Sequence, residues 1–137
     1  MNKKLEKTKK GHPALWECGG GYSNTGYSQI VANADGSPKK PIYIRRRGSL
    51  ANDDHALFIV GVGDVIIEAD HHRGDFNITV SQITHIEDDE AQLEQLHRFS
   101  MGEWDIEPPD KFTNAIQAAE NKACCYHCRR PHFIFEN

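Results

Sequence analysis

The sequence predicts an α+β fold, in which a small antiparallel sheet or partly closed barrel of about five strands is followed by two C-terminal helices. Two observations support this prediction. Short apolar or alternating runs, separated by turn-forming residues, fill the chain from 27 to 86. Beyond residue 87 the apolar residues recur at spacings of three and four, which is typical of helices. Strands first and helices second indicate an α+β domain.

The predicted strands differ in their apolar pattern. The run at 76–86 begins with Phe76, Ile78 and Val80 alternating with polar residues, as in a strand with one buried face. The runs at 56–60 and 65–69 are more continuously apolar and are joined by a Gly-Val-Gly-Asp connection. Short connections of this kind suit an antiparallel meander. The full set of predicted strands is 27–32, 41–47, 56–60, 65–69 and 76–86.

Two helices are expected in the last third of the chain. The first has the acidic residues 87–90 in its first turn, followed by Leu93, Leu96 and Phe99 spaced by three. The second follows Pro108 and Pro109, with Asp110 as the expected cap. Its buried face is predicted from residues at helical spacing, namely Phe112, Ala115, Ile116, Ala119 and Ala123.

The length of 137 residues fits a single globular domain at 13–137, β-rich over 13–86 and helical over 87–137. The lysine-rich segment 1–12 is expected to be a disordered tail. No apolar run approaches the roughly 20 residues that cross a bilayer, and no apolar segment follows the basic start as in a secretory signal. We therefore expect a cytoplasmic protein without membrane contact.

Charge is unevenly distributed along the chain. The first 48 residues carry ten Lys or Arg and three Asp or Glu, which gives them a net charge of +7. Because the whole chain has a net charge of −4, the remaining residues carry −11. A basic end of this kind suggests a polyanionic partner.

A cluster of cysteine and histidine residues near the C-terminus predicts a zinc site. Cys125 and Cys128 have the Cys-x2-Cys spacing that directs two thiolates at one ion, and His132 follows as a third ligand. The fourth ligand is Cys18, Cys124 or His127, and Cys18 would join the two ends of the chain.

Three other interpretations of this cluster remain open. The same ligands suit an iron–sulfur cluster. The Cys-x-His-Cys form at 125–128 occurs in some thiol oxidoreductases, although there the motif begins a helix instead of following one. Alternatively, Cys124 and Cys125 are small buried residues that close a helix.

Asp70, His71 and His72 follow an apolar strand and resemble the metal motif of the DHH phosphoesterases. The resemblance covers these three residues only. That family is longer and uses further aspartates in an α/β fold, so its activity is not carried over. The main interpretation is a hairpin tip at 70–75 with its polar residues exposed to water. The alternative is a catalytic metal site at one end of the barrel, built from His55, Glu68, Asp70, His71 and His72.

The segment 39–47 is a candidate nucleic-acid-binding strand. Alternation places Tyr43, Arg45 and Arg47 on one face, and the isoleucines Ile42 and Ile44 on the core face. Aromatic rings stack on the bases of single strands and guanidinium groups hold phosphates. The alternative is a solvated edge strand, because basic residues protect sheet edges. The predicted nucleic-acid-binding residues are Lys39, Lys40, Tyr43, Arg45 and Arg47.

These observations favour a non-catalytic, zinc-stabilised binding module that contacts nucleic acid or a larger assembly through a basic strand. A small metal-dependent enzyme with the His and Asp site is one alternative. The other is a protein-interaction subunit whose acidic helices around 87–94 and 103–110 dock a basic partner.

Overall fold

The structure is a computed structural model that describes residues 2–4, 14–19, 27–46, 54–72 and 75–124. Within these ranges the chain forms nine β-strands, a short 3-10 helix and one α-helix. The elements are β1 (Asn2–Lys4), β2 (Ala14–Gly19), β3 (Tyr27–Ala32), β4 (Tyr43–Arg46), β5 (Asp54–Val60), β6 (Val65–His72), β7 (Asp75–Glu87), β8 (Glu90–Ser100), β9 (Glu103–Trp104), η1 (Asp110–Phe112) and α1 (Thr113–Cys124).

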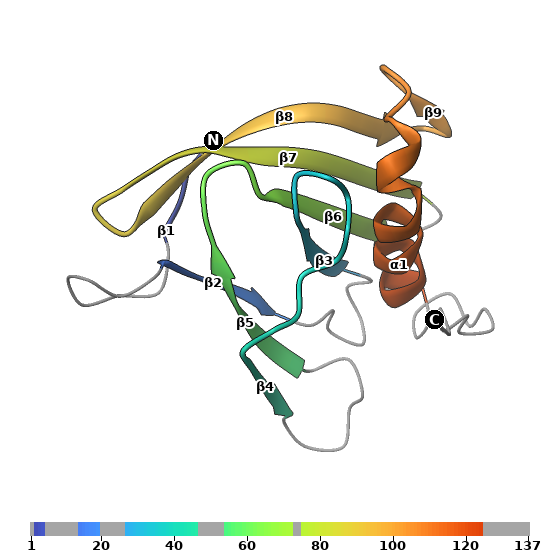
Figure 1. The fold of residues 1–137 in the computed structure, drawn as a ribbon. Helices are drawn as coiled ribbons and strands as arrows, with labels where there is room; N and C mark the ends of the chain where they lie inside the picture. Colours follow the sequence, from blue (N-terminus) through green and yellow to red (C-terminus); the bar gives the residue numbers. More distant parts are fainter. Residues whose placement is uncertain (1, 5–13, 20–26, 47–53, 73–74, 125–137) are drawn as a thin grey trace.

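The strands form two antiparallel sheets (Figure 1). The six-stranded sheet has the order β1-β8-β7-β6-β3, and β9 also pairs with β8. The three-stranded sheet has the order β2-β5-β4. Among the described residues the two sheets share no strand pairing, so they form two sheets instead of the single sheet or barrel that we expected.

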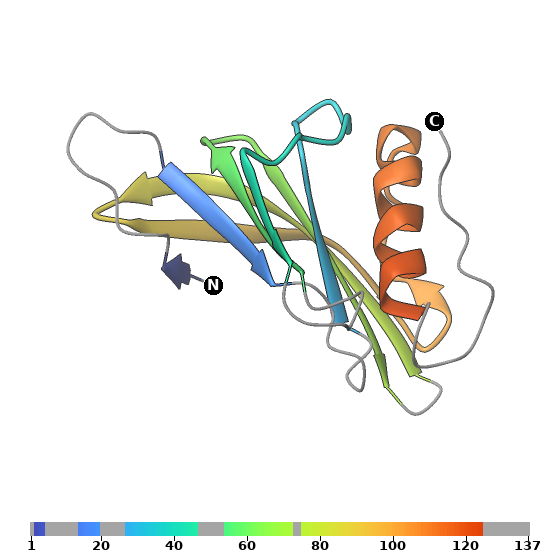
Figure 2. The same ribbon diagram turned by 90° about the horizontal axis from the view of Figure 1, so that it is seen from below.

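The six-stranded sheet is the middle layer of three (Figures 1 and 2). Successive side chains of a strand point to opposite faces, and β6 shows the consequence. Val65, Ile67 and Ala69 pack in one core cluster with α1, whereas Ile66 packs in the other with Trp16 and Phe58 of the three-stranded sheet. The continuous apolar run of β6 therefore reflects burial on both faces.

The α+β class and most of the predicted elements are confirmed. The strand predicted at 27–32 matches β3, and those at 41–47, 56–60, 65–69 and 76–86 correspond to β4, β5, β6 and β7. The second helix is also present, and each residue of its predicted face is buried. Its core cluster contains Phe112, Ala115, Ile116, Ala119 and Ala123.

The first predicted helix is wrong, and with it the helical division at 87–137. Residues 90–100 form β8, which pairs with β7 in a hairpin that closes at Glu87 and Glu90. Asp88 and Asp89 make the two-residue turn with φ angles of 50° and 61°, the left-handed values that hairpin turns require. Cross-strand pairing along β7 and burial of Ala91 therefore outweigh the helical spacing of the apolar residues.

Other local expectations need correction. Asp110 makes no capping hydrogen bond through its side chain; Pro109 precedes η1, which leads into α1. Ile42 lies before β4 and is 54% exposed, so it is not a core residue. Cys18 and Gly19, which precede the first predicted strand, are the last two residues of β2. Asn2–Lys4, within the expected tail, pair with β8, while residues 5–12 lie outside the described ranges.

Candidate functional site

The residues predicted to bind zinc lie only partly within the described ranges. Cys18 in β2 is 4% exposed and packs in the cluster between the two sheets. Cys125, Cys128 and His132 follow α1 and lie outside the described residues, as do the alternative ligand His127 and the redox motif. The structure thus gives Cys18 a place between the sheets, whereas α1 packs on the other face of the six-stranded sheet.

A chain of polar side chains crosses from one sheet to the other beside Cys18. The Trp16 indole N–H donates to Gln29 Oε1 at 3.3 Å. The Gln29 amide donates to Glu68 Oε2 at 3.1 Å, and the Tyr27 hydroxyl donates to the same oxygen at 2.5 Å. Burial, reinforced by this bond and by the charge of Glu68, raises the pKa of Tyr27 well above its ordinary value. The phenol therefore serves as a neutral hydrogen-bond donor to Glu68 within the six-stranded sheet, and the bond from Trp16 to Gln29 joins this group to the smaller sheet.

The residues of the proposed catalytic metal site are divided between two faces of β6. Glu68 lies on the same face of β6 as Ile66, toward the three-stranded sheet, and its carboxylate accepts hydrogen bonds from Tyr27 and Gln29 of the neighbouring strand β3. His71 is three residues further along β6, so its side chain points to the opposite face. Its ring centroid lies 5.4 Å from that of Phe76, which packs against the cluster on the α1 side. The described residues contain no group of three or more His, Cys, Asp or Glu able to hold a metal. The side chains of His55 and His72 are not among those that the structure describes.

The hairpin from β6 to β7 matches the main interpretation of this segment, with one correction. His71 pairs with Phe76 and His72 with Asp75, and residues 73 and 74 between them lie outside the described ranges. Asp70 is exposed as expected, but His71 is buried because Phe76 and the edge of the α1 cluster cover it.

The residues of the basic strand have different surroundings. Lys39 Nζ lies 3.0 Å from an Asp64 carboxylate oxygen and donates to the Ile59 carbonyl at 3.0 Å, so it links this segment to the turn between β5 and β6. Lys40 is exposed. Tyr43 and Arg45 belong to the edge strand β4, where they pair with Leu57 and His55. Arg47 lies just beyond the described residues.

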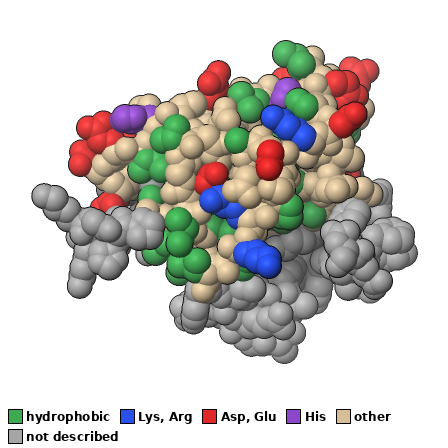
Figure 3. Space-filling model, viewed as in Figure 1, with side chains coloured by type: hydrophobic (Ala, Val, Ile, Leu, Met, Phe, Trp, Pro, Cys, Tyr) green, Lys and Arg blue, Asp and Glu red, His purple; other side chains and the backbone are tan. Residues whose placement is uncertain are grey.

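The three-stranded sheet has one covered face and one outer face. Trp16, Cys18, Phe58 and Val60 pack toward the six-stranded sheet. The outer face carries the alternate residues of β2 and β5, with Ile59 43% exposed, and in register it includes Tyr43 because Tyr43 pairs with Leu57. Hydrophobic side chains gather over the region of β2 and β5 in Figure 3, with Lys or Arg side chains beside them. We define this outer face by Leu15, Glu17, Tyr43, Arg45, Leu57 and Ile59.

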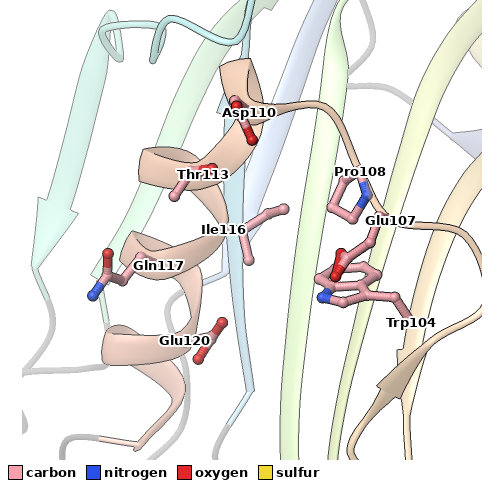
Figure 4. Close-up of a pocket in the computed structure, with 8 residues that line it drawn as sticks. All are labelled: Trp104, Glu107, Pro108, Asp110, Thr113, Ile116, Gln117 and Glu120. Carbon is pink, nitrogen blue, oxygen red and sulfur yellow. The ribbon is translucent and has the colours of Figure 1, made fainter.

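A pocket of about 440 Å³ lies between α1 and the segment that follows β9 (Figure 4). Trp104 and Glu107 form one wall, and residues of α1 form the other. We call it the α1 pocket, and its lining residues are Trp104, Glu107, Pro108, Asp110, Thr113, Ile116, Gln117 and Glu120.

Sequence reasoning missed this pocket because it assigned 103–110 to an acidic helix. Instead, Glu103 and Trp104 form a strand on β8, and the chain then bends at Asp105 and Ile106 before it reaches Pro109. A single aromatic residue within the acidic stretch Glu-Trp-Asp-Ile-Glu was the available signal. The opposite wall comes from α1, so the spacing of residues within one segment gives no direct indication of it.

Compared with known proteins, the chain matches no family model, and no curated protein or solved structure shows significant similarity to it. Among the described residues, no helix has the length and apolar character needed to cross a membrane.

Proposed function

We propose that this protein is a non-catalytic binding module that holds single-stranded nucleic acid on the outer face of its three-stranded sheet. The observation that carries the proposal is that this face combines exposed sheet surface with an aromatic residue at position 43 and a cationic residue at position 45. The six-stranded sheet is covered by α1 on one side and by the smaller sheet on the other. Among the described residues, the smaller sheet contributes one face to a core cluster.

Single-stranded nucleic acid suits such a surface for two reasons. Bases stack on aromatic rings and pack on apolar side chains, and this stacking is largely independent of sequence. Leu57 and Ile59 supply apolar surface, and Tyr43 occupies the position opposite Leu57. Arg45, two residues along the same strand, belongs to the same face.

Cations elsewhere in the chain add to the attraction for phosphate. Lys40 is exposed just before β4, and five further lysines lie in the first ten residues. Contacts of this kind release counterions, so affinity falls as salt rises. Lys39 has a different part in the proposal, because its ammonium group already pairs with Asp64 and stabilises the approach to β4.

Nucleic-acid binding is tested with a labelled oligothymidylate in fluorescence anisotropy at about 50 mM and 200 mM salt, conditions that separate electrostatic contacts. We expect Tyr43→Leu to weaken binding at least about fivefold through loss of stacking, while keeping apolar surface. Arg45→Gln should weaken binding and reduce its dependence on salt. Lys111→Gln is the matched control, since Lys111 is an exposed cation in η1, outside this face.

Two results would overturn the proposal. One is the absence of salt-sensitive binding by the unaltered protein. The other is an equal loss of affinity in Lys111→Gln and Arg45→Gln, which would indicate attraction by overall charge. Binding of a protein in place of the oligonucleotide at this face would assign the sheet to a larger assembly.

The proposal includes a zinc ion held by Cys125, Cys128 and His132, with Cys18 as fourth ligand, because thiolate and imidazole are the preferred zinc donors. Elemental analysis should find about one zinc per chain. Replacing Cys125 and Cys128 together by serine should abolish it, and Cys124→Ser tests the neighbouring candidate for the fourth ligand. Cys18→Ala tests the fourth position. Purified protein without zinc would exclude this part of the proposal.

A further inference from the structure

We propose that the α1 pocket binds the guanidinium group of an arginine side chain that a partner protein presents. This inference is independent of the nucleic-acid proposal, since it concerns a different layer of the fold. It rests on three features of the pocket: a flat aromatic wall held in place, carboxylates around it, and the absence of a cation among the described lining residues.

The Trp104 ring is held by its neighbours before any ligand binds. Trp104 pairs with Phe99 across β8 and β9, and the two rings meet edge to face with centroids 5.3 Å apart. An aromatic pair of this geometry has a preferred orientation. The indole is half-buried, so part of the ring is accessible in the pocket. A guanidinium group can therefore stack on a surface that needs little reorganisation.

Asp105 holds the chain that carries this wall. Its Oδ1 accepts the backbone N–H of Arg98 at 3.0 Å and that of Ile106 at 2.7 Å. These hydrogen bonds lower the pKa of Asp105, and the bond from Arg98 has the largest effect. The carboxylate therefore stays ionised and remains bonded to the backbone. The turn after β9 is thus fixed against β8, and Glu107 follows it into the pocket wall.

The opposite wall comes from one side of α1. Ile116 is buried and belongs to the core cluster beneath the helix, which anchors this wall to the six-stranded sheet. Thr113, Gln117 and Glu120 lie along the same side, at the three- and four-residue spacing of neighbouring helical turns. In Figure 4 the side chains of Ile116 and Glu120 extend from the helix toward the side on which Trp104 and Glu107 lie.

The charges of the lining select a cation. Glu107, Asp110 and Glu120 contribute three carboxylates, of which Glu120 also has a partner within the protein, while the described lining residues include no Lys, Arg or His. Lys111, next to Asp110, lies instead over the Phe112 ring at 5.1 Å from its centroid. A planar guanidinium fits this set better than an ammonium group, because it stacks on indole while its N–H groups pair with carboxylates in its plane.

The same charges indicate a side chain within a polypeptide instead of a free amino acid. Free arginine carries a carboxylate, and the described lining residues offer no cation to balance its charge. An arginine within a peptide carries only the positive charge. The cavity volume of about 440 Å³ lies at the lower end of small-ligand pockets and suits one long side chain.

The two tryptophans of the chain make the test selective. Trp104 lines the pocket, whereas Trp16 is buried between the sheets. A capped Gly-Arg-Gly peptide is titrated into ¹⁵N-labelled protein, and the two indole N–H resonances are followed, with Trp104→Phe identifying the signal of Trp104. We expect this signal to shift saturably, with a dissociation constant on the order of 1 mM, and the Trp16 signal to remain in place.

Two glutamate variants and two further peptides test whether the pocket recognises a guanidinium group. Glu107→Gln should weaken binding by about threefold to tenfold, as expected for loss of one charge-assisted contact. Glu94→Gln, an exposed carboxylate on β8 outside the pocket, should leave it unchanged. The proposal is overturned if the Trp104 signal does not move, if capped Gly-citrulline-Gly or Gly-Lys-Gly shifts it equally, or if both glutamate variants behave alike.

Discussion

Replacing Trp16 with alanine should lower the free energy of unfolding by about 3–5 kcal/mol. Trp16 is 1% exposed in the cluster that joins the two sheets, where it packs with Val31, Phe58 and Ile66. Its removal leaves a large cavity and also removes the donor to Gln29 Oε1. Domains of this size are stable by about 5–15 kcal/mol, so the loss is a large part of the total.

Leu15→Ala is the matched control for this prediction, because Leu15 is the neighbour of Trp16 in β2 and lies on the outer face of the same sheet. It is half-buried, and its truncation should cost only about 1 kcal/mol. Urea unfolding followed by far-ultraviolet circular dichroism measures both variants without relying on tryptophan fluorescence. Equal losses in the two variants would contradict the packing of the smaller sheet through Trp16.

The sequence was sufficient to predict elements whose apolar pattern matches their final environment. The helix α1 was recognised because its buried residues recur at helical spacing after Pro108 and Pro109. In β7 the alternation of Phe76, Ile78 and Val80 matches one buried face. In these segments local pattern and tertiary packing agree.

The strand β8 shows why local pattern was insufficient elsewhere. Leu93, Leu96 and Phe99 have helical spacing, but the strand is defined by its pairing with β7 and by bulges that shift the register after Val80 and Ile83. The positive φ angles of Asp88 and Asp89 close that hairpin. Aspartate tolerates this conformation less readily than glycine, so the acidic run carried no strong turn signal.

The candidate sites depend even more on contacts between distant parts of the chain. Tyr27 and Glu68 are 41 residues apart, yet their side chains form one hydrogen bond. Trp104 faces residues of α1 across the pocket. Composition indicated acidic and basic regions, whereas strand register and layer packing determine which of those side chains share a surface.

Gly36→Ala should lower the free energy of unfolding by roughly 2–4 kcal/mol, through left-handed backbone strain and overpacking together. Gly36 is buried in the turn between β3 and β4, with a φ angle of 92°. A Cβ atom at this position would lie 2.0 Å from the Lys111 carbonyl oxygen and 2.7 Å from its carbon. Because both neighbours are backbone atoms, either the turn or η1 must move.

Gly63→Ala separates the two contributions, because Gly63 has a similar φ angle of 99° but no atom within 4 Å of its added Cβ. It should therefore lose only about 1–2 kcal/mol, from backbone strain. Urea unfolding measures the difference, and the Trp104 indole resonance reports where the clash is relieved. Asp110 and Thr113 flank the Lys111–Phe112 segment and line the α1 pocket, so movement of η1 should shift that signal in Gly36→Ala and not in Gly63→Ala. Equal free energies of unfolding in the two variants would mean that the turn at Gly36 makes no close contact with η1. The start of α1 would then be positioned by the burial of Phe112 and Ile116 alone.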